Sequence, residues 1–340
     1  MRETILVTGG LGYIGSHTVV ELLNEGFKVL IVDNLSNSEK FILDRIEQIT
    51  RVRPLFYEND LCEADTVQKI FSDTIIDVVI HFAAFKSVSE SVKEPLKYFQ
   101  NNLVSLLNVL QAMQYNNVKN FIFSSSATVY GQPDILPATE QTSFQKTLSA
   151  YGSTKQIGEE ILEKVTSTGA IQNISLRYFN PVGAHSSALL GELPKGIPNN
   201  LFPYVMQTAS GKQEQLTVFG NDYDTPDGSC LRDYIHVVDL AKAHVQASKR
   251  LLQQKNKTAF EVFNIGTGKA TSVLEIIKLF EETTGIKMNY KIGRRRKGDA
   301  ASVYADTTKA NRILGWNAQL GLHDMIDSSW KWELSLKYKS

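Results

Sequence analysis

"TGGLGYIGSH", residues 8–17, directly follows the apolar run "ILV" and precedes a stretch with helical periodicity. It contains G-x-G-x-x-G, starting at Gly10, and also T-G-x-x-G-x-x-G. One glycine permits a tight turn, another lets the backbone approach a pyrophosphate without a Cβ in the way, and Gly15 lets the helix pack close to the sheet. The pyrophosphate then lies on the helix N-terminus, where free N–H groups meet it. This context favours dinucleotide binding over a merely structural turn.

An acidic residue after the second apolar run supports this interpretation. Asp33 ends "KVLIVD" (28–33) and could accept hydrogen bonds from the ribose hydroxyls of the adenosine. The carboxylate would repel a 2′-phosphate, and no arginine follows it immediately, so NAD is favoured over NADP. Asp60, in "ENDL" (58–61), is expected beside the adenine because it follows the third apolar run.

Strand and helix patterns alternate through the first half of the chain. Strand-like runs occur at 4–8, 28–33, 54–60, 77–84, 119–126 and 173–180, and long helical patterns occur at 95–116 and 150–168. Strands that are apolar on both faces and separated by helices predict a Rossmann-type, doubly wound parallel α/β sheet. Residues 181–200 are rich in Gly, Pro, Ser and Asn and have no clear period, so an irregular segment is expected after Asn180, and a later helix is expected from Asp239. We therefore expect an NAD-binding domain over 1–180, with later returns near 232–266, and a smaller C-terminal α/β domain over 181–340 that mainly binds substrate.

Composition excludes several classes of protein. Among 340 residues, Lys+Arg and Asp+Glu both number 36, which argues against a general nucleic-acid or membrane-surface binder. The two cysteines form no CxxC and the six histidines show no ligand spacing, so we expect neither a disulfide framework nor a metal site. "RRRK" (294–297) is the only basic run, and on composition it would be a solvated face. The start of the chain is no signal peptide and no apolar run could span a bilayer, so a cytoplasmic protein is expected.

A second motif suggests redox chemistry. "YGSTK" places Tyr151 and Lys155 one helical turn apart, a spacing that is common on ordinary helices but gains weight behind a dinucleotide motif. A phenol is a poor base at neutral pH, but a nearby ammonium and an oxidised nicotinamide favour the phenolate against the effect of burial. Tyr151 could then take a proton from a substrate hydroxyl as hydride leaves the same carbon. Ser124–Ser126 end a strand where α/β sheets place ligands, and turn capping is their alternative role. A functional role is favoured over turn capping for Ser126, and the choice is left open for Ser124.

The whole set of motifs resembles a known family. The sequence is similar to the extended short-chain dehydrogenases/reductases and, within them, to the UDP-glucose (UDP-galactose) 4-epimerases. The matching stretches, in family order, are "VTGGLGYIGSH", "VDNLSNS", "FAAFKSVSESV", "FIFSSSATVYG", "YGSTK", "LRYFNPVGAH", "GIPNNL", "RDYIHVVDLA", "FNIGTG" and "RRKGD". The resemblance implies a seven-stranded Rossmann domain, a smaller C-terminal domain and a homodimer formed through helices 95–116 and 150–168.

The resemblance also implies the site residues. Tyr151 would be the base, Lys155 its cationic partner and Ser126 a hydrogen-bond partner of the reacting hydroxyl. NAD contacts would come from Gly9, Gly12, Tyr13, Ile14, Gly15, Asp33, Asn34, Asn37, Ser38, Asp60, Leu61, Phe82, Ala83, Lys86, Asn101, Tyr151, Lys155 and Phe179. Substrate contacts would come from Lys86, Ser126, Tyr151, Asn180, Asn200, Leu201, Phe219, Arg232, Arg296, Asp299 and Val303. With Arg296 in that set, part of the basic run would be functional.

The implied activity is epimerisation at C4 of a UDP-hexose through a transient 4-keto sugar. Nucleotide-sugar 4,6-dehydratases resemble this chain too, but they carry an Asp-Glu pair where Ala127 and Thr128 stand here, and UDP-glucuronate decarboxylases usually carry a Glu in that stretch. Without these acids the chemistry should stop at oxidation and return. A non-catalytic NAD-binding regulator is a further alternative, although such proteins typically lack the Tyr-x-x-x-Lys pair.

One position concerns the choice of sugar. In the epimerases that this chain resembles, the residue four places after the Asp of "RRxGD" lines the pocket through which a C2 substituent swings, and a tyrosine there restricts the enzyme to UDP-glucose and UDP-galactose. That position is Val303. Valine is much smaller, so we expect activity on UDP-N-acetylglucosamine and UDP-N-acetylgalactosamine as well. The alternative is that Val303 is an ordinary packing residue and another side chain fills the space.

Overall fold

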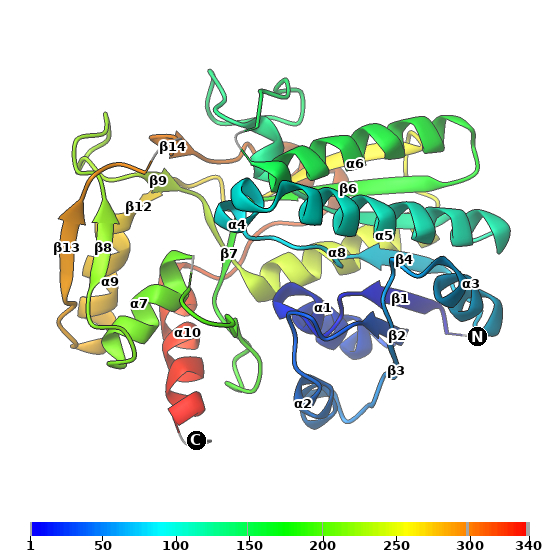
Figure 1. Ribbon diagram of the computed structural model, residues 1–340, viewed down its shortest axis with the longest axis horizontal. Coiled ribbons are helices and arrows are strands. Elements are labelled where there is room, and N and C mark those ends of the chain that lie inside the picture. Colours follow the sequence, from blue (N-terminus) through cyan, green and yellow to red (C-terminus); the bar gives the residue numbers. More distant parts are fainter. Residues whose placement is uncertain (1, 148, 199, 297–298, 338–340) are drawn as a thin grey trace.

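The computed structural model describes residues 2–147, 149–198, 200–296 and 299–337. Within them, a seven-stranded sheet forms the centre of the larger part of the molecule (Figure 1), with the order β11-β6-β5-β4-β1-β2-β3 and every neighbouring pair parallel. The strands are β1 (Thr4–Thr8), β2 (Lys28–Asp33), β3 (Leu55–Glu58), β4 (Val78–His81), β5 (Asn120–Ser126), β6 (Gln172–Tyr178) and β11 (Phe260–Ile265). The strand order reverses beside β1, which creates a crevice at the carboxyl ends of β1 and β4. The expected fold class is confirmed.

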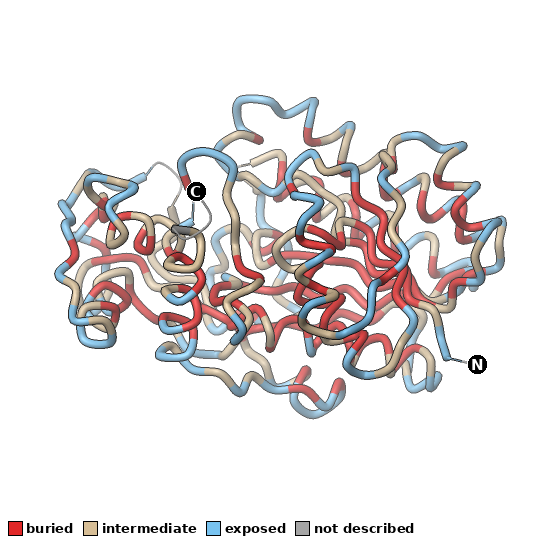
Figure 2. The backbone as a smooth tube through the Cα atoms, turned by 90° about the horizontal axis from the view of Figure 1, so that it is seen from below, coloured by how far each residue is buried: buried red, intermediate tan, exposed pale blue. Residues whose placement is uncertain are grey.

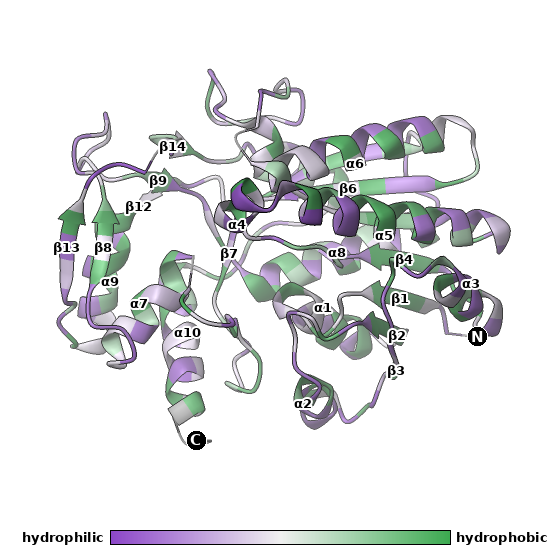
Figure 3. Ribbon diagram, viewed as in Figure 1, coloured by the Kyte–Doolittle hydropathy of each residue, from purple (hydrophilic) through white to green (hydrophobic). Residues whose placement is uncertain are grey.

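The central strands form because they are apolar on both faces. Leu6 and Val7 on β1 alternate toward opposite faces and both are fully buried. Figure 2 shows the sheet as the buried centre, and Figure 3 shows that β1, β2 and β4 are mostly apolar. Such strands are stable only when both faces are covered by helices.

Two layers of helices provide that cover. One face packs against α1 (Tyr13–Asn24), α2 (Phe41–Thr50) and α8 (Val237–Leu252). The other packs against α3 (Ala64–Asp73), α5 (Pro95–Tyr115) and α6 (Ala150–Ser167), with the short α4 (Val88–Lys93) beside α5 and α6. In Figure 1, α5 and α6 run side by side along the sheet.

A smaller part lies beyond the carboxyl ends of the strands, at the left of Figure 1. Its strands pair as β7 (Asn180–Val182) with β10 (Tyr234–His236), as β8 (Leu216–Phe219) with β13 (Tyr290–Gly293), and as β12 (Thr271–Ser272), β9 (Leu231–Arg232) and β14 (Ser302–Val303). Its helices are α7 (Leu201–Ala209), α9 (Val273–Thr284) and α10 (Leu322–Lys337), around a separate apolar core. The short helices η1 (Ala127–Tyr130) and η2 (Ala310–Leu314) complete the fold.

Two local expectations need correction. The helix expected from Asp239 begins at Val237, because the His236 side chain caps its N-terminus and accepts a hydrogen bond from Val238 N at 3.1 Å. The irregular segment expected after Asn180 begins with a short strand, β7, which is held by parallel pairing with β10. That pairing joins segments that are distant in the sequence, so no local pattern indicates it.

Candidate active site

The glycine turn joins β1 to α1 at the crevice. Gly9 has a φ of +66°, which favours glycine, and a Cβ there would lie 2.9 Å from Ala83 N, in the segment just after β4. A Cβ on Gly15 would lie 2.2 Å from Gly9 O, so only glycine permits this contact between helix and turn. Gly12 is the N-cap of α1, whose first N–H groups point out of the helix end. The turn therefore has the shape that a pyrophosphate requires.

Asp33 connects this turn to the end of β2. Its Oδ2 accepts from Leu11 N at 3.0 Å, and its Oδ1 accepts from Leu35 N at 3.0 Å and Ser38 Oγ at 2.7 Å. The side chain is buried and points toward the glycine turn. Asp33 therefore helps to hold the glycine turn, in addition to the ribose contact expected of it.

The segments after β2 and β3 meet beside Asp33. Asn34 Nδ2 donates to Asp60 Oδ2 at 3.0 Å, while Cys62 N donates to Asp60 Oδ1 at 2.8 Å. Burial acts to raise the pKa of Asp60, but these hydrogen bonds outweigh it and lower that pKa. Leu61 is buried next to it. The carboxylate is thus held charged at the edge where the adenosine is expected.

Tyr151 lies near the N-terminus of α6, which Ser149 caps by accepting from Gly152 N at 3.2 Å. The Lys155 ammonium lies 5.8 Å from the centre of the Tyr151 ring and donates to Ser124 O at 2.7 Å. Burial raises the pKa of Tyr151, and a hydrogen bond with the Ser126 side chain opposes that rise. The structure thus brings Tyr151, Lys155 and Ser126 together.

The two serines differ in their contacts. Ser126 Oγ also accepts from Thr128 N at 3.2 Å, so it caps η1 as well as contacting Tyr151. Ser124 Oγ instead shares a hydrogen bond with the Tyr178 hydroxyl on β6. The question left open for Ser124 therefore has a structural answer: its side chain binds Tyr178 and its carbonyl holds Lys155.

Sequence reasoning missed two residues that organise this site. Tyr178 ends β6 and its hydroxyl hydrogen-bonds to Ser124, and Asn102 of α5 is buried against Thr154 of α6. Asn102 Oδ1 accepts from Phe85 N at 2.8 Å, and its Nδ2 donates to Thr154 Oγ1 at 3.2 Å. It therefore ties the loop after β4 to α6. "RYFN" and "NN" in the sequence are weak signals that could have drawn attention to them.

The other residues expected to contact NAD lie around the same crevice. Phe82 follows β4 and packs on His244 with ring centres 4.6 Å apart. Asn101 Nδ2 donates to the Asn102 side chain at 2.9 Å. Phe179 is buried directly after β6, and Asn37 is exposed after β2. Ile14, on the first turn of α1, packs against the core next to the glycine turn.

The residues expected to bind the UDP-sugar lie mostly in the smaller part. Arg232 on β9 donates to Ala300 O at 2.9 Å and lies 3.6 Å from Asp299 Oδ1. The Arg296 guanidinium stacks 4.0 Å from the centre of the Phe219 ring. Arg232 and Arg296 thus have partners, an acid and a ring, that hold them beside β9 and β8. Asn180 is exposed at the start of β7 and Leu201 starts α7.

Val303 lies between the two parts of the candidate site. It pairs with Arg232 in the β14–β9 register and packs on the cluster that contains Phe179. Ala127, the residue after Ser126, packs on the same cluster. Val303 therefore belongs to the same cluster as the expected cofactor contact Phe179 and as Ala127, the residue after Ser126.

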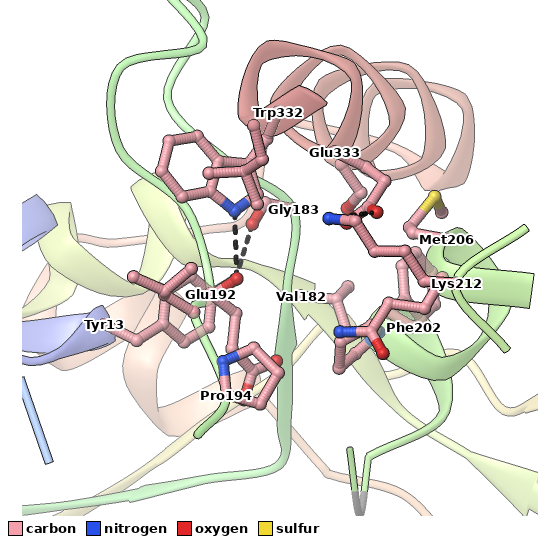
Figure 4. Close-up of a pocket in the computed structure, with 15 residues that line it drawn as sticks. Tyr13, Val182, Gly183, Glu192, Pro194, Phe202, Met206, Lys212, Trp332 and Glu333 are labelled. Carbon is pink, nitrogen blue, oxygen red and sulfur yellow. Dashed lines mark hydrogen bonds and ion pairs between the residues drawn. The ribbon is translucent and has the colours of Figure 1, made fainter. Parts of the chain in front are cut away.

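A cavity of about 190 Å³ lies to one side of these residues, where Tyr13 meets α7, α10 and the loop after β7 (Figure 4). Glu192 borders it and joins Lys86 at 3.0 Å to Asn200 Nδ2 at 2.9 Å. The Tyr13 hydroxyl donates to Gly183 O at 2.6 Å. Tyr151 is not among the residues that line this cavity, so the cavity is next to the reacting centre and separate from it.

Comparison with known proteins agrees with the geometry. The family model described as GDP-mannose 4,6 dehydratase matches residues 6–329. A UDP-glucose 4-epimerase of Bacillus subtilis is 50% identical, and the match covers 97% of each chain. A solved UDP-glucose-4-epimerase of Stenotrophomonas maltophila, with bound NAD and formylated UDP-arabinopyranose, has a TM-score of 0.97, 46% identity and full coverage of both chains. A Bifidobacterium longum UDP-glucose 4-epimerase with NAD+ and UDP has a TM-score of 0.93, 49% identity and 98% coverage of both.

This chain belongs to the extended short-chain dehydrogenase/reductase family that the GDP-mannose 4,6 dehydratase model describes. Within that family it is similar to the UDP-glucose 4-epimerases. In the part of the chain that the structure describes, no helix is long and apolar enough to cross a membrane. The same residues contain no cluster of three or more His, Cys, Asp or Glu side chains placed to hold a metal ion.

Proposed function

We propose that this protein is an NAD-dependent UDP-hexose 4-epimerase that interconverts UDP-glucose and UDP-galactose through a transient 4-keto sugar. One observation carries the proposal: Tyr151 contacts Ser126 and has the Lys155 ammonium 5.8 Å from its ring, at the sheet edge that also holds the glycine turn. The similar proteins named above are UDP-glucose 4-epimerases, which supports the same activity here.

The chain fits NAD. The glycine turn offers a surface without side chains at the N-terminus of α1, and Asp33 lies at the end of β2, where an adenosine ribose would be. When bound, NAD supplies a hydride acceptor for C4 of the sugar and, once reduced, a hydride donor. Because the cofactor is regenerated in every cycle, it can stay bound through turnover.

The chain's own residues supply the proton chemistry. Tyr151 takes the proton of the C4 hydroxyl and later returns it, while the Lys155 ammonium stabilises the phenolate. Ser126 orients the hydroxyl by hydrogen bonding. The 4-keto sugar must then rotate within the site so that hydride returns to its other face. This rotation requires that the protein makes few strong contacts to the sugar. Affinity therefore resides in the UDP, and Arg232 and Arg296 would clamp its diphosphate.

Dehydration and decarboxylation, the related activities, require acidic side chains that the start of η1 does not carry here. A 4,6-dehydratase needs an acid and a base beside C5 and C6, but η1 begins with Ala127 and Thr128. Glu159, the buried carboxylate on α6 near this point, is paired with Arg177 at 2.5 Å. The chemistry therefore stops at oxidation and return, which supports epimerisation over dehydration or decarboxylation.

The substrate range includes the N-acetylated sugars. Val303 packs on the cluster around Phe179 without the bulk of a tyrosine. Replacing a tyrosine with a valine leaves room for an acetamido group at C2 as the sugar turns. UDP-N-acetylglucosamine and UDP-N-acetylgalactosamine are therefore substrates together with UDP-glucose and UDP-galactose.

We further propose the organisation of the molecule. Residues 1–180 with 232–266 bind NAD, and 181–340 mainly bind the UDP-sugar. Two chains pair through α5 and α6, because α5 exposes the apolar side chains of Leu96 by 80% and Leu107 by 49%. The proposed location is the cytoplasm. Leu107→Glu should convert the dimer to a monomer in light scattering, whereas Gln48→Glu, at an exposed position on α2 across the sheet from α5, is the matched control and should leave the dimer intact.

The test of the activity needs only the purified protein and UDP-galactose, without added cofactor. Conversion to a stable mixture of UDP-glucose and UDP-galactose supports the proposal, and nucleotide released on denaturation should be about one NAD per chain. Bound NAD with no conversion of any UDP-sugar would instead support the non-catalytic regulator.

A further inference from the structure

Three buried side chains form a row on one face of α6. Tyr151, Lys155 and Glu159 follow one another at intervals of four residues, and their exposed fractions are 8%, 4% and 2%. Residues spaced this way lie one above another on a helix. The proposed reaction uses the first two members of the row, and it leaves the third without a role.

Glu159 is held by partners from two strands. Its carboxylate pairs with the Arg177 guanidinium of β6, with Nε–Oε1 at 2.9 Å and Nη2–Oε2 at 2.5 Å. The Ser125 hydroxyl of β5 donates to Oε1. Arg177 in turn donates to the Tyr130 hydroxyl at 3.1 Å. The carboxylate therefore has one fixed position, on the Lys155 side of α6.

Lys155 has few groups that could keep it charged. The Lys155 ammonium donates a hydrogen bond to the Ser124 carbonyl at 2.7 Å, and the Phe123 ring centre lies 4.9 Å from the ammonium nitrogen. Burial and the charge of Lys155 both lower the pKa of His81 on β4, which keeps His81 neutral. Glu159 is the carboxylate whose charge acts on Lys155. Burial lowers the pKa of Lys155 to about 8, and Glu159 opposes that effect.

We propose that Glu159 is a positioning residue of the epimerase reaction: it keeps the Lys155 ammonium charged beside Tyr151, and Arg177 sets how much of the Glu159 charge Lys155 feels. The inference rests on the proposed function only for its catalytic consequence. Without Glu159, two cations, Lys155 and Arg177, would lie in the same buried region with no anion between them. Lys155 would then lose its proton at lower pH.

The first experiment measures Lys155 directly and does not depend on turnover. The carbon-13 shift of Lys155 Cε is followed against pH in the NAD-loaded protein, with the signal assigned by its loss in Lys155→Met. Glu159→Gln should move the midpoint down by about one pH unit, the order of shift that the loss of a nearby opposite charge produces. Glu159→Asp keeps the charge and should stay near the wild-type midpoint.

Arg177→Gln should shift the Lys155 midpoint in the opposite direction. It frees the Glu159 charge from its partner, so the Lys155 midpoint should rise, whereas Arg177→Lys should leave it near wild type. In the variants that convert UDP-galactose, the pH at which the rate falls on the alkaline side should shift in the same direction as the Lys155 midpoint. If wild type fails to convert any UDP-sugar, the proposed function fails while the titration still tests this inference.

Three results would overturn the proposal. One is a Lys155 midpoint that Glu159→Gln leaves unchanged in folded, NAD-bound protein. Another is a shift of the same sign in Glu159→Gln and Arg177→Gln. The third is that Glu159→Asp, which keeps the charge, lowers the midpoint as far as Glu159→Gln does, because packing and not charge would then set the pKa of Lys155.

Discussion

The Lys155 ammonium lies 5.8 Å from the centre of the Tyr151 ring, one helical turn away on α6, and both side chains are buried. This relationship defines the reacting end of the candidate site. Burial alone disfavours both the phenolate and the ammonium, so each charge depends on the other and on the groups around it. The predictions below follow from this pair and from the glycine turn that faces it.

Removal of the Tyr151 hydroxyl tests the base. Tyr151→Phe should retain the fold and the bound NAD but lower the rate of epimerisation by about 10²–10⁴-fold, the usual contribution of a general base. Released nucleotide and circular dichroism serve as controls for folding. Turnover close to that of wild type would remove Tyr151 from the mechanism.

The glycine turn is tested by a single methyl group. A Cβ on Gly15 would lie 2.2 Å from Gly9 O, so Gly15→Ala should lower the free energy of unfolding of the cofactor-free protein by about 1–3 kcal/mol. Gly12→Ala is the matched variant, because its Cβ would approach only Gly9 O, at 3.2 Å. It should keep more of that stability but weaken NAD binding. Equal stability of the two variants in urea would contradict the packing argument.

The pH dependence of activity follows from Lys155. Burial lowers the pKa of Lys155 to about 8, against the opposing charge of Glu159. The ammonium is present below that pH and is lost as pH rises through it, so the phenolate loses its cationic partner. The rate should therefore fall on the alkaline side of about pH 8. A rate that is constant up to pH 10 would show that the charge on Lys155 is not required.

The pH dependence of stability follows from buried histidines. Burial lowers the pKa of His17 and His81 to about 3 and that of His236 and His244 to about 4. Between these values and about 6.5 the unfolded chain binds more protons than the folded one, so stability falls as pH decreases through that window. Each such histidine contributes about 1.4 kcal/mol per pH unit.

Paired variants isolate this histidine effect from that of the carboxylates. His244→Gln should make the loss of stability between pH 6.5 and 4.5 less steep in urea unfolding, while His323→Gln, at an exposed position, should leave the slope unchanged. Identical slopes in both variants would assign the acid sensitivity to other groups.

Val303 tests the choice of sugar. Wild type should epimerise UDP-N-acetylglucosamine as well as UDP-glucose, and Val303→Tyr should abolish the first reaction by steric exclusion while largely sparing the second. Val303→Ile serves as a control for a small increase in volume and should retain both. Wild type that converts UDP-glucose but not UDP-N-acetylglucosamine would show that another side chain fills the pocket.

Local patterns in the sequence were sufficient for most of the fold. Periodicity predicted six strands of the sheet and the helices α5 and α6, because each depends on its own apolar residues. The glycine turn and the Tyr–Lys spacing likewise predicted which residues meet at the crevice. The pairing of β7 with β10 could not be predicted in this way, since it joins segments far apart in the chain.

The contacts behind the site were also beyond sequence reasoning. Tyr178 and Ser124 are 54 residues apart, and Arg177 and Glu159 are 18 apart, on elements that only the folded sheet brings together. Nothing in "RYFN" or "GEE" indicates those partners. Buried polar pairs of this kind become visible only when the register of β5 and β6 is known.

The most direct test of the central claim follows the hydrogen at C4. UDP-glucose carrying deuterium at C4 is incubated with the purified protein in ordinary water, and the UDP-galactose formed is examined by NMR and mass spectrometry. Hydride that leaves C4 and returns to the opposite face of the same carbon predicts that the deuterium is retained at C4 of the product. UDP-galactose that has exchanged this deuterium for solvent hydrogen would contradict the account.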